Sequence, residues 1–600
     1  MPTKPTNRYD IAVKKLPFFD SRSWLALLVA IPAVVSHALA APEVAFDFTT
    51  AGTTWHGAVA AMLSLAFLFA LPRLLPPRQA IGWAFLAAFG GRLLTLHWLT
   101  GVSVVGWIVL AAACAAMVLP AIRYAAVHAP PTSSHCPFRW ALQTALLYTA
   151  WESLLAFLFG GFPWNRLAVG VASCLPLAQL AELGGTPLLT LLAALVAAAL
   201  AVLLVPACQP WRRRAPAALL LVLLPGAFWT GHWLLGRIDA RLAAPAYAAD
   251  TLPVALVQPA IPQPDKWNAE KVDLIYSRLD TLSREAMQVV STAAGEGAGL
   301  SMSSSAVAVP PRLLIWPEAA LPDEVLYSPR SYAVVTNLLA AFPGRCPSLL
   351  IGSLDLFVHA DKATYDYANS AILFAPGGKP LASYAKRKLV IVGEYTPILC
   401  WLSTRVQEWL AIHVGTPLSL VAGKISGLFR LPGCEWALSP LICYEDIFPG
   451  LARADVAHGS SLLVNLTNDA WFDDVQCPRQ HAANASLRAI ETRRPLLRCA
   501  NTGLTCAIDP SGRFSAILGL PSAAPTSLPE ASAAAPGPVT ARPGVLHVQV
   551  PIPAYPPTTF FVRFGYFLDP ALALLALVQM GTLGVRRLRQ RLRATSAVAA

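Results

Sequence analysis

Charged side chains are scarce in this sequence. Asp, Glu, Lys and Arg make up only 13% of the 600 residues, whereas hydrophobic residues make up 56%. Soluble globular chains carry about a quarter of their residues as charged side chains, so the composition excludes a purely soluble protein as well as a fibrous or disordered one. The sequence also has no Cys-x-x-Cys pair and no His-Glu-x-x-His motif. The usual motifs of a zinc site are therefore absent.

The hydrophobic residues are unevenly distributed. Residues 22–236 and 565–585 are nearly all apolar, whereas 250–550 has ordinary polar and charged content. About 300 residues are ample for a hydrophobic core. We therefore predict three parts: an N-terminal membrane domain of about seven helices at 1–236, an extracytoplasmic domain at 237–564, and a transmembrane helix with a basic cytoplasmic tail at 565–600.

The apolar regions divide into membrane-spanning segments. A spanning helix needs about 20 mostly apolar residues, and eight segments fit: 23–42, 56–72, 80–99, 102–122, 140–160, 184–207, 216–236 and 565–585. Basic residues occupy alternate connections, among them Arg73, Arg78 and Arg212 to Arg214, as the positive-inside rule requires of cytoplasmic loops. The net charge of +12 is thus mainly a topology signal. Because no single face or motif gathers this charge, we expect no nucleic-acid partner.

Two features of the membrane part leave alternatives open. Lys14 and Lys15 before an apolar run ending in SHALAAP also fit a cleavable signal peptide; we favour an uncleaved helix, and both alternatives place the large domain outside. Glu152 lies near mid-span in WESLLAFLFGGFPWNRLAVG, a segment that continues through Gly161 to Asn165 at the outer boundary. A polar residue in a span is often functional, but Glu152 could equally pair with another span, and the GFPW residues could be an interfacial anchor.

The polar domain has the pattern of a layered α/β fold. Eight short apolar runs are each followed by a turn: LPVALVQP, PRLLIWPE, SLLIGSLD, NSAILFAP, WALSPLICYE, SSLLVNLTND, PLLRCANTG and TCAIDPSG. Continuous apolar strands that alternate with helices, here 268–289, 330–342 and 479–493, indicate a sheet covered on both faces. Two stretches rich in small residues, 291–311 and 521–543, are predicted to be solvated insertions.

Three reactive residues stand at the ends of predicted strands: Glu318 after LLIWP, Lys386 in SYAKRKLVIVGEYTP, and Cys443 at the end of LSPLIC. Taken singly, each has a structural explanation, as a solvated carboxylate, a solvated ammonium and a small core residue. Taken together, they form a chemical set. A carboxylate can take the proton of a thiol that attacks a carbonyl, and an ammonium can stabilise the resulting oxyanion.

At these residues the chain resembles a known family. The stretches VALVQPAIPQPDKW, LLIWPEAALP, YDYANSAILF, YAKRKLVIVGEYTP, LICYEDIFP, VNLTNDAWF and LRAIETRRPLLRCANTG resemble the carbon–nitrogen hydrolase (nitrilase) superfamily, whose Glu–Lys–Cys triad lies on an α-β-β-α sandwich. With GFPW and LAELGG in the membrane part, the whole chain resembles the apolipoprotein N-acyltransferase family. The resemblance implies that Glu318 is the general base, Cys443 the acylated nucleophile, and Lys386 the cation that stabilises the charged intermediate.

The resemblance extends to residues around the triad. It implies that Glu394 orients the catalytic lysine and that Tyr444 and Glu445 support the nucleophile. It also implies substrate contacts for Trp267 and Trp471, although a turn with an aromatic lid would explain Trp471 equally well. The chain departs from the family pattern at 388–392, which reads KLVIV, and at Asp473, where glycine is usual.

The implied activity is acyl transfer at a bacterial inner membrane, with the catalytic domain on the periplasmic side. The acyl donor would be a phospholipid, the intermediate a Cys443 thioester, and the acceptor the α-amine of a diacylglyceryl lipoprotein, with no metal or organic cofactor and a monomeric enzyme. The alternative is a membrane-tethered nitrilase-type amidase acting on a soluble carbon–nitrogen substrate. A non-catalytic transporter or scaffold is a third class, which the complete triad disfavours.

Overall fold

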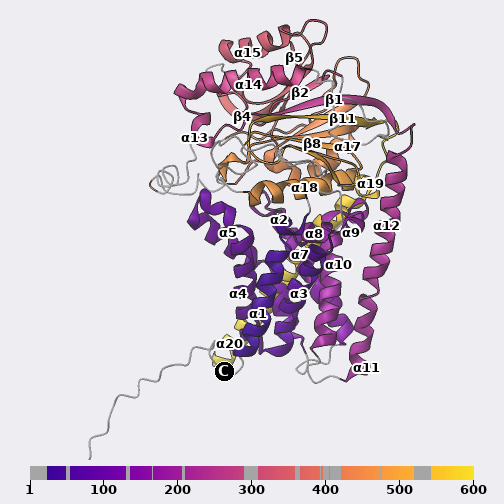
Figure 1. The fold of residues 1–600 in the computed structure, drawn as a ribbon. Helices are drawn as coiled ribbons and strands as arrows, with labels where there is room; N and C mark the ends of the chain where they lie inside the picture. The colour runs from indigo at the N-terminus through magenta and orange to yellow at the C-terminus, as the bar shows by residue number, and fades with distance from the viewer. Residues whose placement is uncertain are drawn as a thin grey trace, which may run out of the picture.

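The chain folds into a helical bundle below a layered α/β part (Figure 1). The computed structural model describes residues 23–46, 48, 54–129, 136–164, 166–205, 210–288, 309–358, 365–391, 393–395, 405, 420–472, 475–518 and 542–599. The predicted insertions at 291–311 and 521–543 fall almost entirely outside these residues. The N-terminal lysines, Asn165, Val392 and Asp473 fall outside them too.

Each of the eight predicted spans coincides with a helix or a pair of helices. In chain order these are α1 (Ser23–Leu39), α3 (His56–Leu74), α4 (Pro77–Thr95), α5 (Val104–Ala116) with α6 (Leu119–Val127), α7 (Pro137–Leu155), α10 (Ala181–Leu204), α12 (Leu223–Leu242) and α20 (Leu568–Ala599). Within the described residues, five helical segments are long and apolar enough to cross a membrane: His56–Leu74, Val104–Val127, Ala181–Leu204, Trp211–Leu242 and Gly565–Thr582. Helix α1 is apolar but shorter.

Small residues dominate where the helices of the bundle meet. Alanines of α3, α7 and α10 are fully or almost fully buried in one cluster, among them Ala61, Ala145 and Ala197. Small side chains allow helix backbones to approach closely. The resulting van der Waals packing stabilises the bundle, because lipid provides no hydrophobic driving force between helices. The basic helix α11 (Trp211–Arg214) and the C-terminus both lie at the end of the bundle away from the sheets (Figure 1).

Two sheets form the centre of the α/β part. The first has the order β11-β1-β2-β3-β4-β5 and the second β10-β9-β8-β7-β6. Strands β1, β2 and β3 are parallel, as are β6, β7 and β8, and the remaining strands β4, β5, β9, β10 and β11 pair antiparallel. The bounds are β1 (Ala248–Gln258), β2 (Leu313–Ile315), β3 (Ser348–Val358), β4 (Tyr365–Phe374), β5 (Pro380–Ala385), β6 (Ala437–Ile442), β7 (Ser460–Thr467), β8 (Leu496–Ala500), β9 (Cys506–Ile508), β10 (Phe514–Ile517) and β11 (Gly544–Pro553).

Three buried clusters define the layers. One lies between the sheets and includes Val254 of β1 and Val464 of β7. Another joins the first sheet to α14 (Val272–Met287) and α15 (Pro329–Ala340), and a third joins the second sheet to α17 (Pro449–Ala457) and α18 (Gln476–Thr492). The α-β-β-α sandwich and the helical bundle predicted from the sequence are therefore confirmed, and α18 lies between the second sheet and the bundle (Figure 1).

The structure adds three strands to the eight that were predicted, namely β5, β10 and β11. The divisions predicted at 236/237 and 564/565 stay a prediction: α12 ends at Leu242, and α20 begins at Leu568. All nine cysteines that the described part of the chain contains are free thiols.

Candidate active site

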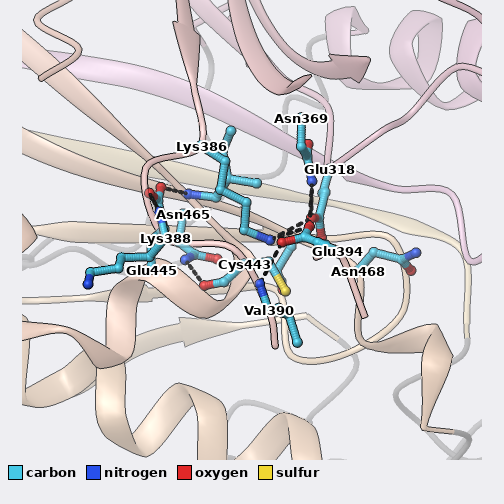
Figure 2. A network of polar contacts seen from close by, with 12 residues as sticks. Glu318, Asn369, Lys386, Lys388, Val390, Glu394, Cys443, Glu445, Asn465 and Asn468 are labelled. Atoms are coloured by element: carbon cyan, nitrogen blue, oxygen red, sulfur yellow. Dashed lines mark hydrogen bonds and ion pairs between the residues drawn. The ribbon is translucent and has the colours of Figure 1, made fainter. Parts of the chain in front are cut away.

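Three strand ends place the reactive side chains in one region. Glu318 follows β2, Lys386 follows β5 directly, and Cys443 follows β6. Figure 2 shows the Cys443 sulfur beside the group formed by Lys386, Glu318 and Glu394. Strands from the two sheets thus bring together residues that are spread over 125 positions of the sequence, from Glu318 to Cys443.

Lys386 is held between two carboxylates. Its side chain is 1% exposed, and Nζ donates a hydrogen bond to Glu394 Oε1 at 2.7 Å and a longer one to Glu318 Oε1 at 3.5 Å. Burial alone would lower the pKa of Lys386, but Glu394 and Glu318 outweigh it and raise the pKa above its ordinary value. The ammonium therefore stays charged in a buried site, as a group that stabilises an oxyanion must.

Asn369 fixes the two carboxylates relative to each other. Its Nδ2 donates to Glu318 Oε1 at 2.7 Å and lies 3.3 Å from Glu394 Oε1, while its backbone oxygen accepts a hydrogen bond from Lys386 N at 2.8 Å. Asn369 lies in YDYANSAILF, one of the stretches that carry the family resemblance, but the sequence predicts no role for it. The available indication was an amide side chain within a strand whose last four residues, 371–374, are apolar and buried.

Cys443 has a strained backbone. Its φ is 48°, in the left-handed region that non-glycine residues rarely adopt, at a cost of about 1–3 kcal/mol. The carbonyl oxygen of Cys443 accepts hydrogen bonds from Asn465 Nδ2 at 2.9 Å and His481 Nε2 at 3.1 Å. These two donors hold the turn at the start of η6 (Cys443–Ile447), and the turn directs the sulfur toward the ammonium and carboxylates (Figure 2).

The charges around Cys443 favour the neutral thiol at rest. Burial raises the pKa of this thiol well above its usual value, Glu318 raises it further, and Lys386 offsets only part of the effect. A thiol with a raised pKa is a weak nucleophile until a base removes its proton. An attack by Cys443 would therefore need a base to take the thiol proton, and Glu318 is the carboxylate whose charge acts most strongly on this thiol.

Glu445 connects the loop that follows Lys386 to the turn that begins at Cys443. Its fully buried carboxylate accepts hydrogen bonds from the backbone N–H groups of Ile442 at 2.8 Å, Arg387 at 2.7 Å and Lys388 at 3.1 Å. Tyr384 adds a hydroxyl donor at 2.7 Å. The Glu445 carboxylate therefore fixes the backbone directly before Cys443 and directly after Lys386.

A buried network of charged side chains holds η6 through its residue Asp446. His481 Nδ1 donates to Asp469 Oδ1 at 3.0 Å, and Nε2 forms an ion pair with Asp446 at 2.9 Å. Arg498 pairs with Asp446 and lies 3.6 Å from Asp469. Burial lowers the pKa of His481, but Asp446 and Asp469 outweigh burial and repulsion from Arg498 and raise it to about 9. A protonated imidazole can donate from both nitrogens, as the Cys443 carbonyl requires. This network was not predicted from the sequence.

Tyr444 attaches the turn that begins at Cys443 to the membrane part. Its hydroxyl donates to the carbonyl oxygen of Gly161 at 2.8 Å, and its ring stacks on Trp164 with centroids 6.4 Å apart. Nearby, Trp98 and Trp164 both donate to Gln480 Oε1 of α18, at 3.0 and 2.8 Å. The GFPW segment therefore supports the catalytic part directly.

Glu152 has a structural role in the bundle. Its carboxylate accepts hydrogen bonds from the backbone N–H of Leu167 at 3.0 Å and from the Thr190 hydroxyl of α10 at 2.6 Å. The sequence left open whether Glu152 is functional or pairs with another span, and the structure shows that it pairs with α10.

The two candidate substrate-contacting tryptophans lie on linked loops. Trp267 follows α13 (Gln263–Lys266) and is 49% exposed, and Trp471 ends η7 (Asp469–Trp471) and is 53% exposed. Asn468 Nδ2 donates to Gln263 Oε1 at 2.9 Å and ties the two loops together. Both rings are therefore accessible from solvent. In the described part of the chain, no cluster of His, Cys, Asp and Glu could hold a metal ion.

Comparisons with known proteins agree with this geometry. The family model described as carbon-nitrogen hydrolase matches residues 253–522, and the model described as apolipoprotein N-acyltransferase N-terminal domain matches residues 44–199. The chain is 33% identical to the apolipoprotein N-acyltransferase of Geobacter metallireducens, over 73% of this chain and 78% of that protein.

Two further relatives cover both parts of the chain. The apolipoprotein N-acyltransferase of Azotobacter vinelandii is 33% identical over 76% of this chain and 81% of its own length. The one from Rhodopseudomonas palustris is 30% identical over 84% and 85%. Because these likenesses span the bundle as well as the sandwich, they favour an acyltransferase over a tethered amidase. The chain belongs to the apolipoprotein N-acyltransferase family.

Proposed function

We propose that this enzyme transfers an acyl chain from a membrane phospholipid, through a thioester on Cys443, to the α-amine of the S-diacylglyceryl cysteine of a lipoprotein. The observation that carries the proposal is the convergence of Glu318, Lys386 and Cys443 in a buried site that rests on membrane helices through Tyr444. Both substrates are lipids, so an active site attached to the bundle can meet them at the membrane surface.

The first half-reaction forms the thioester. Glu318 takes the proton of Cys443, and the thiolate sulfur attacks the ester carbonyl carbon of the phospholipid. The negative charge that develops on the carbonyl oxygen is stabilised by the ammonium of Lys386, which Glu394 holds in place at 2.7 Å. The carbon–oxygen bond then breaks, and the lysophospholipid leaves with the proton carried by Glu318.

The second half-reaction forms the amide. The free α-amine of the lipoprotein cysteine attacks the thioester carbonyl, and Glu318 accepts a proton from the amine. The carbon–sulfur bond breaks, the acylated lipoprotein leaves, and Cys443 regains its proton. Cys443 is partly buried beside the fully buried Lys386 ammonium, and this shielding from solvent limits competing hydrolysis by water.

We further propose that the enzyme is a monomer in the bacterial inner membrane, with the sandwich on the periplasmic side. The basic helix α11 and the C-terminus lie at the opposite end of the bundle from the sandwich, and basic segments favour the cytoplasmic side. The divisions at 1–236, 237–564 and 565–600 follow from the same topology. We assign contact with the acyl chains to Trp267 and Trp471, because both rings are exposed beside the site.

A direct test looks for the thioester. The purified enzyme is incubated with phospholipid in detergent, and its peptides are analysed by mass spectrometry. We expect one acyl group on Cys443, released by hydroxylamine, in the wild type and in Cys346→Ala, a control thiol outside the site. Cys443→Ala should acquire none. An active enzyme that never carries an acyl group on Cys443 would refute the proposal, and a thioester formed only from soluble amides would favour the amidase.

A further inference from the structure

A second lysine lies in the site and has no role in the reaction described so far. Lys266 is 3% exposed, and its Nζ donates a hydrogen bond to the backbone carbonyl oxygen of Glu318 at 2.9 Å. Lysine is almost never fully buried unless its charge is paired. A backbone carbonyl alone is a weak partner for a buried ammonium, so the position of Lys266 beside the catalytic carboxylate needs a chemical reason.

The charges of the site do not balance without Lys266. Glu318 and Glu394 contribute two negative charges, and Lys386, hydrogen-bonded to both, contributes one positive charge. Transfer of the Cys443 proton to Glu318 leaves this sum unchanged, because one carboxylate is neutralised as one thiolate forms. A net charge of minus one in a buried site is unfavourable. A second ammonium brings the sum to zero before and after the transfer.

The turn that carries Glu318 is held from two sides. Ala319 has a φ of 42°, which is strained for a non-glycine residue. On one side is Gly352 of β3, where a Cβ would come within 2.5 Å of the Pro317 oxygen, so only glycine allows this approach. On the other side, Lys266 Nζ binds the Glu318 carbonyl. The lysine is fixed in turn, because α13 is tied to η7 through Gln263.

We propose that Lys266 is a positioning residue that holds the Glu318 turn beside the nucleophile and supplies the positive charge that balances the Cys443 thiolate. Lys386 then stabilises the oxyanion, while Lys266 stabilises the thiolate and positions the base Glu318. This inference rests on the acyl transfer through Cys443 proposed above. It also gives a reason for the position of the α13 loop, which directs an ammonium inward at Lys266 and an aromatic ring outward at Trp267.

The protonation of Lys266 makes the inference testable by pH. Burial lowers the pKa of Lys266 to about 8, against the opposing influence of Glu318 and Cys443. The other charged groups that act on the thiol include Glu318 after β2, Lys386 after β5, Asp469 in η7 and Arg498 of β8. The charge on Lys266 is therefore present near neutral pH and lost as the pH rises through about 8.

The experiment measures alkylation of Cys443 by iodoacetamide in the full-length enzyme in detergent, followed at the Cys443 peptide by mass spectrometry. Lys266→Met removes the charge and Lys266→Arg keeps it. Lys271→Met removes a lysine from the neighbouring η4 (Ala269–Lys271), outside the site. We expect Lys266→Met to react about tenfold more slowly than the wild type near neutral pH. The difference should shrink above pH about 8, where the wild type also loses the charge.

Lys266→Arg should react like the wild type near neutral pH and keep its rate advantage over Lys266→Met at higher pH, and Lys271→Met should match the wild type throughout. Equal rates for Lys266→Met and wild type, or a ratio that does not change with pH, would overturn the inference, since a purely structural role predicts a constant ratio. If Lys266→Met fails to fold, Lys266→Gln provides the same comparison with a donor retained. Alkylation needs no lipid, so the result is independent of whether Cys443 accepts an acyl group.

Discussion

The buried imidazole of His481 is predicted to stabilise the fold only while it is protonated. Its pKa is about 9 in the folded protein, against 6.5 for an ordinary histidine. A pKa that is higher in the folded state gives a contribution that is complete below pH 6.5 and is lost as the pH rises through about 9. The difference between the two pKa values corresponds to about 3 kcal/mol of unfolding free energy.

The perturbation is His481→Gln, which keeps a neutral donor and removes the titrating ring. Thermal denaturation of the detergent-purified protein between about pH 6 and about pH 10 should give a lower Tm for the variant near pH 6, and the gap to the wild type should narrow toward pH 9. His458→Gln, at an exposed position of the same domain, serves as the control and should leave the pH profile unchanged. A gap that is constant across this range would show that His481 is not protonated in the fold and would refute the reasoning.

Three further substitutions test other parts of the structure. Glu394→Gln removes the carboxylate that holds the Lys386 ammonium at 2.7 Å, so thioester formation should slow by about a hundredfold with little change in Tm; a normal rate of acylation would exclude the orienting role of Glu394. Tyr444→Phe keeps the stacked ring but loses the hydrogen bond to Gly161, and thermal denaturation should show a loss of about 1 kcal/mol; an unchanged Tm would mean that this bond does not anchor the turn. Arg166→Met breaks the buried ion pair with Asp569 at 3.0 Å and should cost about 3–5 kcal/mol of stability. The double variant Arg166→Met with Asp569→Leu should recover most of that loss, and a double variant no more stable than the single one would contradict the pairing.

The sequence predicted the elements whose apolar pattern is local. All eight predicted strands are present because each is a short apolar run that ends at a turn. Strand β11 was missed even though GVLHVQVPIP alternates in the way a half-buried strand does. Strand β5 was missed for a different reason, since PLASYA lies at a sheet edge and most of its side chains are at least partly exposed.

The sequence could not predict the contacts that hold Cys443. The left-handed conformation of Cys443 occurs at a residue other than glycine, so no local pattern marks it. His481 and Asn465 act on its carbonyl from 38 and 22 positions away. Gln480 accepts hydrogen bonds from tryptophans that are 382 and 316 positions earlier in the chain. Interactions over such separations depend on the tertiary fold, and only the family resemblance indicated where the reactive residues would meet.

Helix α18 has a consequence for any attempt to produce the sandwich alone. Almost every one of its side chains is buried, and Ala482, Leu487 and Ile490 belong to the same apolar cluster as the bundle helices. A truncated protein without the bundle would expose these apolar side chains of α18 to water. It would also remove the hydrogen bonds that Trp98 and Trp164 donate to Gln480. Truncation should therefore yield an aggregating fragment, and a soluble version would need a new outer face on α18.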